Sequence, residues 1–239
     1  MTLRIKSRVL SIVLMPFSLF LLSSVSVGQS PPATPTSQQS VDTVTAQIRL
    51  ARSRMYNVDN QFQKLEDRSP FAPPLLHSHT PDTTLDELPA SVSGTILLGT
   101  ITASQVNQSE DHRTLYTEST IKVERVINQQ QLLAKEGNSI AVTQAGGNLL
   151  LASGRMLSHI SVGTGDPLQI GGRYVFFLLY ASAGQCYKIA TAWALKDGYA
   201  RAMGAVDIER AQHGKSLYEG MPETEFLRKV STLTASFKP

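Results

Sequence analysis

The chain has 239 residues and a formal net charge of +3, with 41% hydrophobic and 17% charged residues. This composition excludes a disordered acidic chain and a highly charged nucleic-acid-binding tail, because both classes contain far fewer apolar residues. The length fits one large domain, or one medium domain with an extension.

The excess of positive over negative charge comes from the start of the chain. Arg4, Lys6 and Arg8 are the charged residues of segment 1–28, and without them 19 basic and 19 acidic residues remain. A near-neutral remainder is a poor surface for nucleic acid, whose phosphates are neutralised by Lys and Arg. We therefore expect no nucleic-acid partner.

The first 28 residues have the order of a secretory signal peptide. The basic start is followed by 14 uncharged residues, 9–22, and then by small residues up to Gly28. As a helix, these 14 residues would reach about 21 Å, which is shorter than a hydrocarbon core of about 30 Å. We expect cleavage between Gly28 and Gln29, a secreted or periplasmic location, and no membrane span after cleavage. The alternative is an uncleaved N-terminal anchor.

A linker and a long helix are predicted next. Residues 29–40 are mainly Pro, Ser, Thr and Gln, which is typical of a flexible linker. Segment 41–68 has no Pro or Gly, and its apolar residues alternate at spacings of three and four, as in a heptad repeat. The helix predicted over 41–68 either forms a homo-oligomeric coiled coil through residues 41–65 or lies along its own domain. Its apolar stripe is Val41, Val44, Ile48, Ala51, Met55, Val58, Phe62 and Leu65.

Segment 69–90 contains five prolines, which exclude a helix interior or a central strand, so we expect a surface connection. His77 and His79 lie within it. Two such histidines could bind a metal, but no Cys or acidic cluster lies at the spacing of known sites. We therefore expect neither a metal nor a cofactor.

Residues 91–239 have the pattern of a β domain with a C-terminal helix. Fifteen of the sixteen glycines lie at or after Gly94, whereas nine of the twelve prolines lie at or before Pro89. Residues 144–147 and the pair Asp197-Gly198 are hairpin signals. The helix begins near Pro222 and has a stripe of apolar residues. Strands are predicted over residues 93–103, 114–123, 139–143, 148–152, 155–162, 174–180, 187–195 and 199–203.

The sequence contains no nucleophile elbow, no zinc-protease helix motif and no phosphate-binding loop. Acidic residues such as Glu110, Asp111 and Glu118 are scattered. Cys186 is the only cysteine, so it is a buried small side chain, an intermolecular bridge or a reactive thiol. One alternative function follows, a small secreted hydrolase that uses Cys186 or Ser158 with His159.

Several segments of residues 90–234 resemble a known group. They are Gly-Thr-Ile-Thr at 99–102, Ile-Lys-Val-Glu-Arg-Val at 121–126, Ile-Gly-Gly-Arg-Tyr-Val-Phe-Phe-Leu at 170–178 and Trp-Ala-Leu-Lys-Asp-Gly at 193–198. The pattern resembles uncharacterised secreted bacterial proteins and, more distantly, small OB-like barrels of the netrin-like and metalloproteinase-inhibitor type. Animal members of that type use Cys pairs that this chain lacks, so no inhibitory residue is carried over.

The resemblance implies a mainly β fold, a small antiparallel OB-like barrel with a short C-terminal helix. The long N-terminal helix predicted over 41–68 precedes this barrel and has no counterpart in that group. For function, we expect an exported, non-enzymatic binding or structural module of the bacterial cell envelope. Its partner is an envelope protein or ligand that the sequence does not identify.

Overall fold

The computed structural model describes residues 38–58, 64–65, 75–77, 87–130, 133–161 and 167–235. Segment Gln38–Pro239 forms one compact unit. The predicted signal peptide, its cleavage site between Gly28 and Gln29 and most of the predicted linker lie outside the described residues. None of the helices in the described part of the chain is long and apolar enough to cross a membrane.

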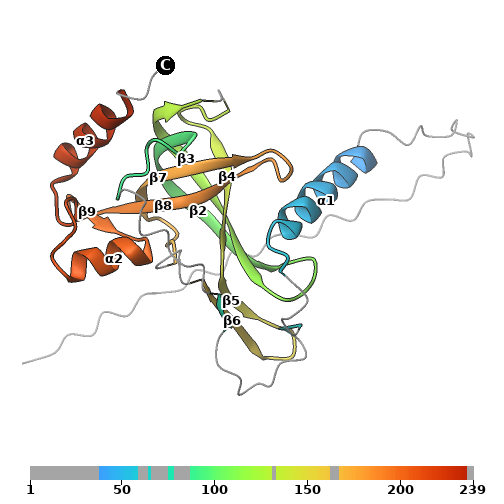
Figure 1. The fold of residues 1–239 in the computed structure, drawn as a ribbon. Coiled ribbons are helices and arrows are strands. Elements are labelled where there is room, and N and C mark those ends of the chain that lie inside the picture. Colours follow the sequence, from blue (N-terminus) through green and yellow to red (C-terminus); the bar gives the residue numbers. More distant parts are fainter. Residues whose placement is uncertain are drawn as a thin grey trace, which may run out of the picture. The chain divides into compact units, whose positions relative to one another are not determined.

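A six-stranded sheet forms the centre of the fold (Figure 1). Its strand order is β4-β3-β2-β7-β8-β9, and these neighbours are antiparallel. One edge of β8 pairs with β4 near the start of β8 and with β9 near its end. The strands are β2 (Thr95–Gln108), β3 (Leu115–Gln129), β4 (Ser139–Ala145), β7 (Arg173–Ala181), β8 (Cys186–Lys196) and β9 (Tyr199–Ala202). The fold is therefore mainly β, as predicted. Five strands form a partly closed ring, and β9 pairs with the end of β8.

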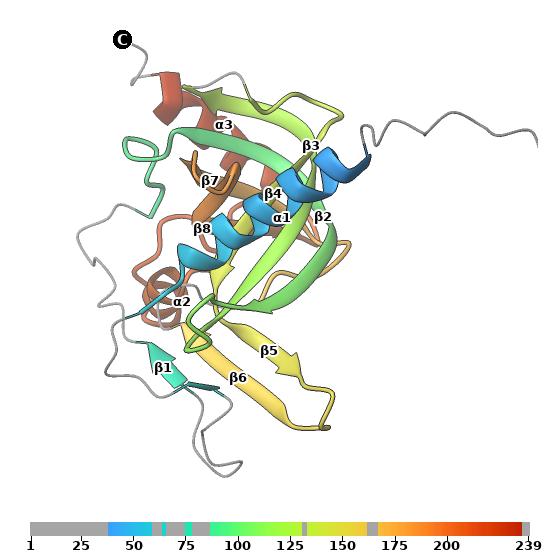
Figure 2. The ribbon, with the colours of Figure 1, turned by 90° about the vertical axis from the view of Figure 1, so that its right-hand side faces the viewer.

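A second, three-stranded sheet has the order β1-β6-β5. It consists of β1 (Leu75–His77), β5 (Gly147–Leu150) and β6 (Met156–Ser161), and Figure 2 shows it beside one end of the larger sheet. The hairpin predicted at residues 144–147 is wrong, because β4 and β5 belong to different sheets. Gly147 has a φ of 138°, and a Cβ there would lie 2.8 Å from Thr117 Oγ1. Glycine thus lets the chain bend from one sheet into the other against β3.

The first half of β2 and most of β7 are apolar on both faces because each face meets its own core. Alternate side chains point to opposite sides of a strand. Leu97, Phe176 and Leu178 face the ring interior, whereas Ile96 and Phe177 belong to a cluster that includes residues of α3 (Glu223–Ala235). The sequence pattern predicted both buried strands, although not their pairing, and the C-terminal helix.

Helix α3 covers one side of the sheet. Its Phe226 and Val230 are fully buried, and the ring of Phe226 lies 5.4 Å from that of Trp193, centroid to centroid. A second helix, α2 (Ala205–Gln212), was not predicted and follows β9. Figure 1 shows α2 and α3 on the opposite side of the sheet from α1.

The predicted N-terminal helix is shorter than expected. α1 spans Gln38–Arg54, so the prediction of one helix over 41–68 is wrong. The amides of Met55, Tyr56 and Asn57 bond to carbonyls three residues back, which tightens the helix into its final turns. The next amide, of Val58, bonds to Asp111 of the sheet domain instead. Tertiary hydrogen bonds thus end the helix.

The apolar stripe of α1 is only partly covered. Of its members, Val44 is 53% exposed and Ile48 and Ala51 are half-buried, whereas Tyr56, just beyond the helix, is buried. Packing against the domain is therefore concentrated at the C-terminal end of α1. Pairing of this helix with a second copy stays a prediction.

The stability of the fold is expected to depend on the fully buried aromatic side chains between the sheet and α3. Replacing Phe177 by Ala should lower the free energy of unfolding by about 3–5 kcal/mol, since the change removes apolar contacts and leaves a cavity. Leu179→Ala on the same strand is the matched control, because Leu179 is 42% exposed. Its cost should stay below about 1 kcal/mol. Urea unfolding measures both variants, and equal losses would contradict this assignment of the core.

Candidate functional site

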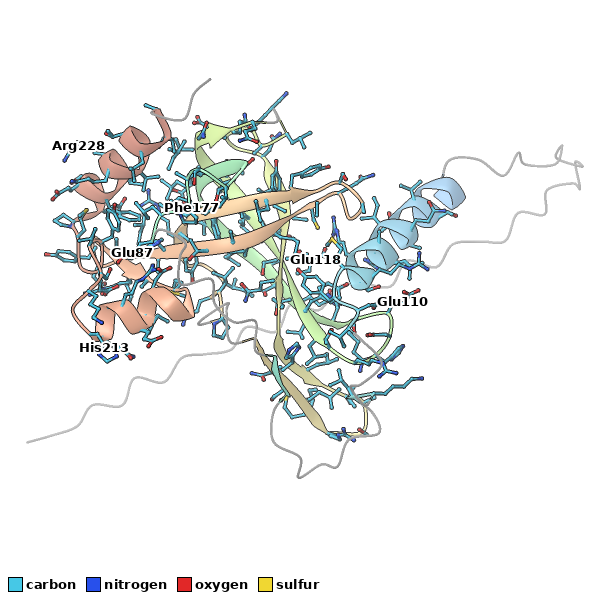
Figure 3. The ribbon with its side chains drawn as sticks, in the orientation of Figure 1. Glu87, Glu110, Glu118, Phe177, His213 and Arg228 are labelled. Atoms are coloured by element: carbon cyan, nitrogen blue, oxygen red, sulfur yellow. The ribbon has the colours of Figure 1, made fainter. Side chains whose placement is uncertain are left out.

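Residues 52–58, at the end of α1, bind to a polar and aromatic surface of the sheet domain. We call residues 52–58 the docked segment. Figure 3 shows Glu110 and Glu118 of this surface beside the end of α1. The docking face comprises Glu110, Asp111, Thr114, Tyr116, Glu118, Thr143, Gly184, Gln185, Cys186 and Lys188, from β3, β4, β8 and the loops 109–114 and 182–185.

The side chain of Arg52 is held by three acceptors of the docking face. Its Nη1 lies 2.5 Å from Glu118 Oε1, Nε donates to the carbonyl oxygen of Gly184 at 2.8 Å, and Nη2 donates to that of Gln185 at 3.3 Å. Only 12% of the side chain is exposed. The planar guanidinium presents several donors in a fixed fork, which suits this arrangement of acceptors.

Tyr56 is the aromatic anchor of the docked segment. Its ring stacks on that of Tyr116 with centroids 4.8 Å apart and an interplanar angle of 5°. Lys188 Nζ lies 5.6 Å from the Tyr56 centroid on the docking face. Thr114 Oγ1 donates to the Tyr56 carbonyl at 2.5 Å. Burial raises the pKa of the Tyr56 phenol, so the ring is neutral at physiological pH.

The outer part of the contact is more exposed. Arg54 pairs with Glu110 at 2.9 Å, and the Asn57 side-chain amide donates to the same carboxylate at 3.2 Å. These hydrogen bonds, first that of Arg54, lower the pKa of Glu110. Ion pairs this exposed contribute little to stability. We therefore expect the buried contacts of Arg52 and Tyr56 to contribute more to docking than this exposed pair.

Cys186 lies beneath the docked segment. It is 1% exposed, and its Sγ is 3.8 Å from Thr143 Oγ1. A Cβ on Gly184 would lie 3.0–3.2 Å from Arg52 Cγ, Met55 Cε and Cys186 Sγ, so these atoms converge at one point. Burial raises the pKa of the thiol. Of the three interpretations of this cysteine, the buried side chain is confirmed.

The remaining candidates for nucleophilic catalysis occupy β6. Ser158 and His159 are neighbours on that strand, and successive side chains of a strand point to opposite faces. His159 is buried, and its Nδ1 lies 3.1 Å from the amide nitrogen of Leu115, a donor to that ring atom. The thiol of Cys186 contacts Thr143 of β4 instead. The structure thus places these three side chains in separate surroundings.

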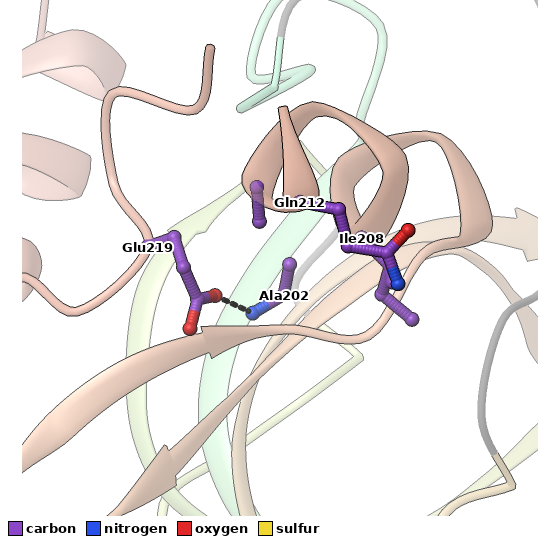
Figure 4. Close-up of a pocket in the computed structure, with 5 residues that line it drawn as sticks. Ala202, Ile208, Gln212 and Glu219 are labelled. Carbon is purple, nitrogen blue, oxygen red and sulfur yellow. Dashed lines mark hydrogen bonds between the residues drawn. The ribbon is translucent and has the colours of Figure 1, made fainter. Parts of the chain in front are cut away.

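A pocket of about 380 Å³ lies between β9 and α2 (Figure 4). It is lined by Ala202, Ile208, Ala211, Gln212 and Glu219. Glu219 is already engaged, since Oε2 accepts the Ala202 amide at 2.7 Å and Oε1 pairs with Arg201 at 2.9 Å. Gln212 is therefore the main side chain of this lining that could hydrogen-bond to a ligand and orient it. This pocket is for that reason a weaker candidate binding site than the docking face.

Within the described ranges, no group of three or more His, Cys, Asp or Glu side chains could hold a metal ion. His79 and the side chain of His77 lie outside the described residues.

Sequence patterns alone did not identify the docking face. Glu110, Asp111 and Glu118 are scattered along the sequence, and Arg52 and Tyr56 lie outside the apolar stripe of the predicted helix. A weak signal existed, because two arginines lie in the last helical turn and two adjacent acids lie at positions 110 and 111, and Arg54 does pair with Glu110. Nothing local indicates that the two segments meet.

Asp207, near the pocket, should make stability depend on pH. It is 6% exposed and accepts from Thr191 at 3.1 Å, and burial raises its pKa to about 6. The unfolded carboxyl loses its proton near pH 3.9, so between pH 4 and 6 the folded state holds more protons. Raising the pH from 4 to 7 should therefore destabilise the protein by up to about 3 kcal/mol through this group.

The variant Asp207→Asn separates this effect from those of other carboxylates. Its side-chain oxygen can still accept from Thr191, but it does not titrate. Urea unfolding at several pH values should show the wild type losing stability relative to Asp207→Asn as the pH rises. Parallel curves for the two proteins would contradict the shifted pKa.

No family model matches this sequence, and no curated protein matches it significantly.

Proposed function

We propose that this chain is an exported, non-enzymatic binding or structural module of the bacterial cell envelope, built on a small OB-like barrel. One observation carries the proposal. Two loops and strand β3 converge on one face of the ring, where carboxylates, carbonyls and an aromatic ring hold a peptide segment. A surface that already binds one peptide has the chemistry of a binding site.

The strand pairing supports the OB-like part of the proposal. The ring contains five strands and is partly closed through β4 and β8. OB-like barrels bind ligands on the face of their second and third strands and in the loops joining strands one to two and four to five. In this ring those elements are β3, β4 and the loops 109–114 and 182–185. The fold alone does not specify the ligand.

The environment of Cys186 supports a non-enzymatic role. Catalytic thiols are usually partly exposed and have a lowered pKa, whereas Cys186 is buried and its pKa is raised. Ser158 and His159 point to opposite sides of β6 by strand alternation. Neither arrangement favours the alternative of a hydrolase.

Export is tested by isolating the chain from bacterial cell fractions and sequencing its N-terminus. A mature chain in the envelope or medium should begin at Gln29. Replacing Arg4, Lys6 and Arg8 by Gln should reduce export, because the basic start is part of the signal. A chain that begins at Met1 and stays in the cytoplasm would contradict the export proposal.

Binding is tested by placing a photo-crosslinking amino acid at Ala183, an exposed position of the loop 182–185. Irradiation of intact cells should yield an adduct of defined mass from this position. The matched control places the same amino acid at Arg228, an exposed position on α3 that Figure 3 shows far from the docking face. Equal adducts from both positions, or none from Ala183, would contradict binding at this face.

A further inference from the structure

We propose that the docking face is a binding site for a partner peptide that presents an arginine and, four residues later, a tyrosine. The docked segment fills this site within the same chain until the partner displaces it. This inference rests on the proposed function and identifies the chemistry of the partner.

The acceptors around Arg52 select for arginine. A carboxylate, that of Glu118, and the carbonyl oxygens of Gly184 and Gln185 surround the guanidinium. Three acceptors in different directions match the rigid fork of arginine better than the compact ammonium of lysine. A partner without arginine at this position would leave a half-buried carboxylate unpaired, which is unfavourable.

The other end of the face recognises an aromatic ring and two backbone groups. Tyr116 offers its ring face, and the Lys188 ammonium lies within cation–π distance of the bound ring. Thr114 donates to the carbonyl of Tyr56, and Asp111 accepts from the amide of Val58. These two bonds reach only the peptide backbone, so they would hold a partner segment as well as the chain's own.

The docked segment can leave without opening the two main cores. The buried clusters inside the ring and beneath α3 contain no residue of segment 38–58. The helix that precedes the segment is largely exposed, and the Arg54–Glu110 pair is a surface contact. Release would uncover Tyr116 and Cys186 but leave the strand pairing intact.

Self-occupancy lowers the apparent affinity for a partner. A ligand that needs the empty face binds in proportion to the fraction of molecules in which the face is empty. If the segment is docked about 99% of the time, a tenfold weakening of docking raises the apparent affinity about tenfold. Substitutions in the docked segment should therefore strengthen binding in trans.

The experiment uses the full chain and a fluorescein-labelled synthetic peptide of residues 48–58, with binding measured by fluorescence anisotropy. The double variant Arg52→Ala, Tyr56→Ala should bind the peptide at least about tenfold more tightly than the wild type. Arg54→Ala alters only the exposed ion pair and should give a smaller gain. Arg228→Ala, on α3, is the matched control and should behave as the wild type.

Specificity is tested on both sides of the contact. Adding Glu118→Gln to the double variant should weaken binding at least about tenfold, because the guanidinium loses its ionic partner. Peptides with Arg52→Lys or Tyr56→Leu should also bind more weakly. Binding that ignores all of these changes would overturn the proposal.

Cys186 supplies an internal measure of release. A disulfide reagent that forms a mixed disulfide with exposed thiols should react at least about tenfold faster in the double variant, and added peptide should slow the reaction.

A folded double variant that neither binds the peptide nor exposes the thiol would overturn the proposal. Assembly of the variant into dimers in place of peptide binding would overturn it too. Crosslinking at Ala183 without peptide binding would refute this inference alone and leave the binding-module proposal standing.

Discussion

The parallel pairing of β4 with β8, through Val142 with Tyr187 and Thr143 with Lys188, is the contact on which the rest of the structure depends. Without this pairing, β4 and β8 would be separated by three strands of the same sheet, and the inner face of the sheet would be exposed to solvent. With it, the sheet curves into a ring, and side chains such as Leu97, Val142 and Phe176 pack together inside. Burial of apolar side chains is the main favourable contribution to folding, so ring closure and core formation are one event.

The same pairing creates the docking face. It places Thr143 of β4 beside Cys186 of β8, and it sets the loop 182–185 within reach of the residues that precede and begin β3. The end of α1 covers this surface with a guanidinium and an aromatic ring. This cover accounts for the burial of Cys186 at the start of β8. The docked segment thereby occupies the face, and its contacts define the chemistry of the proposed partner.

Much of the fold could be predicted because its signals are local. The alternation in β3, the apolar run of β7, the positive φ values at Asp197 and Gly198 and the stripe of α3 each depend on a few neighbouring residues. The errors share the opposite property. Segment 41–68 has a continuous helical pattern, yet the helix ends at Arg54, and the backbone amide of Val58 bonds to Asp111 in place of a helical carbonyl. Residues 144–147 have hairpin glycines, yet the chain passes there between two sheets because Gly147 packs against β3.

By itself, the sequence determined the mainly β class, the positions of most strands and the closing helix, since periodicity and turn residues act over short distances. The sequence also shows that the net positive charge comes from the first eight residues. Only the tertiary structure decided which strands close the ring, where α1 ends and which residues meet at the docking face. Arg52 and Glu118 are 66 positions apart, and their contact follows from the path of the whole chain, which no local pattern contains. The burial of Cys186 was decided in the same way, because the docked segment that covers it lies far from it in the sequence.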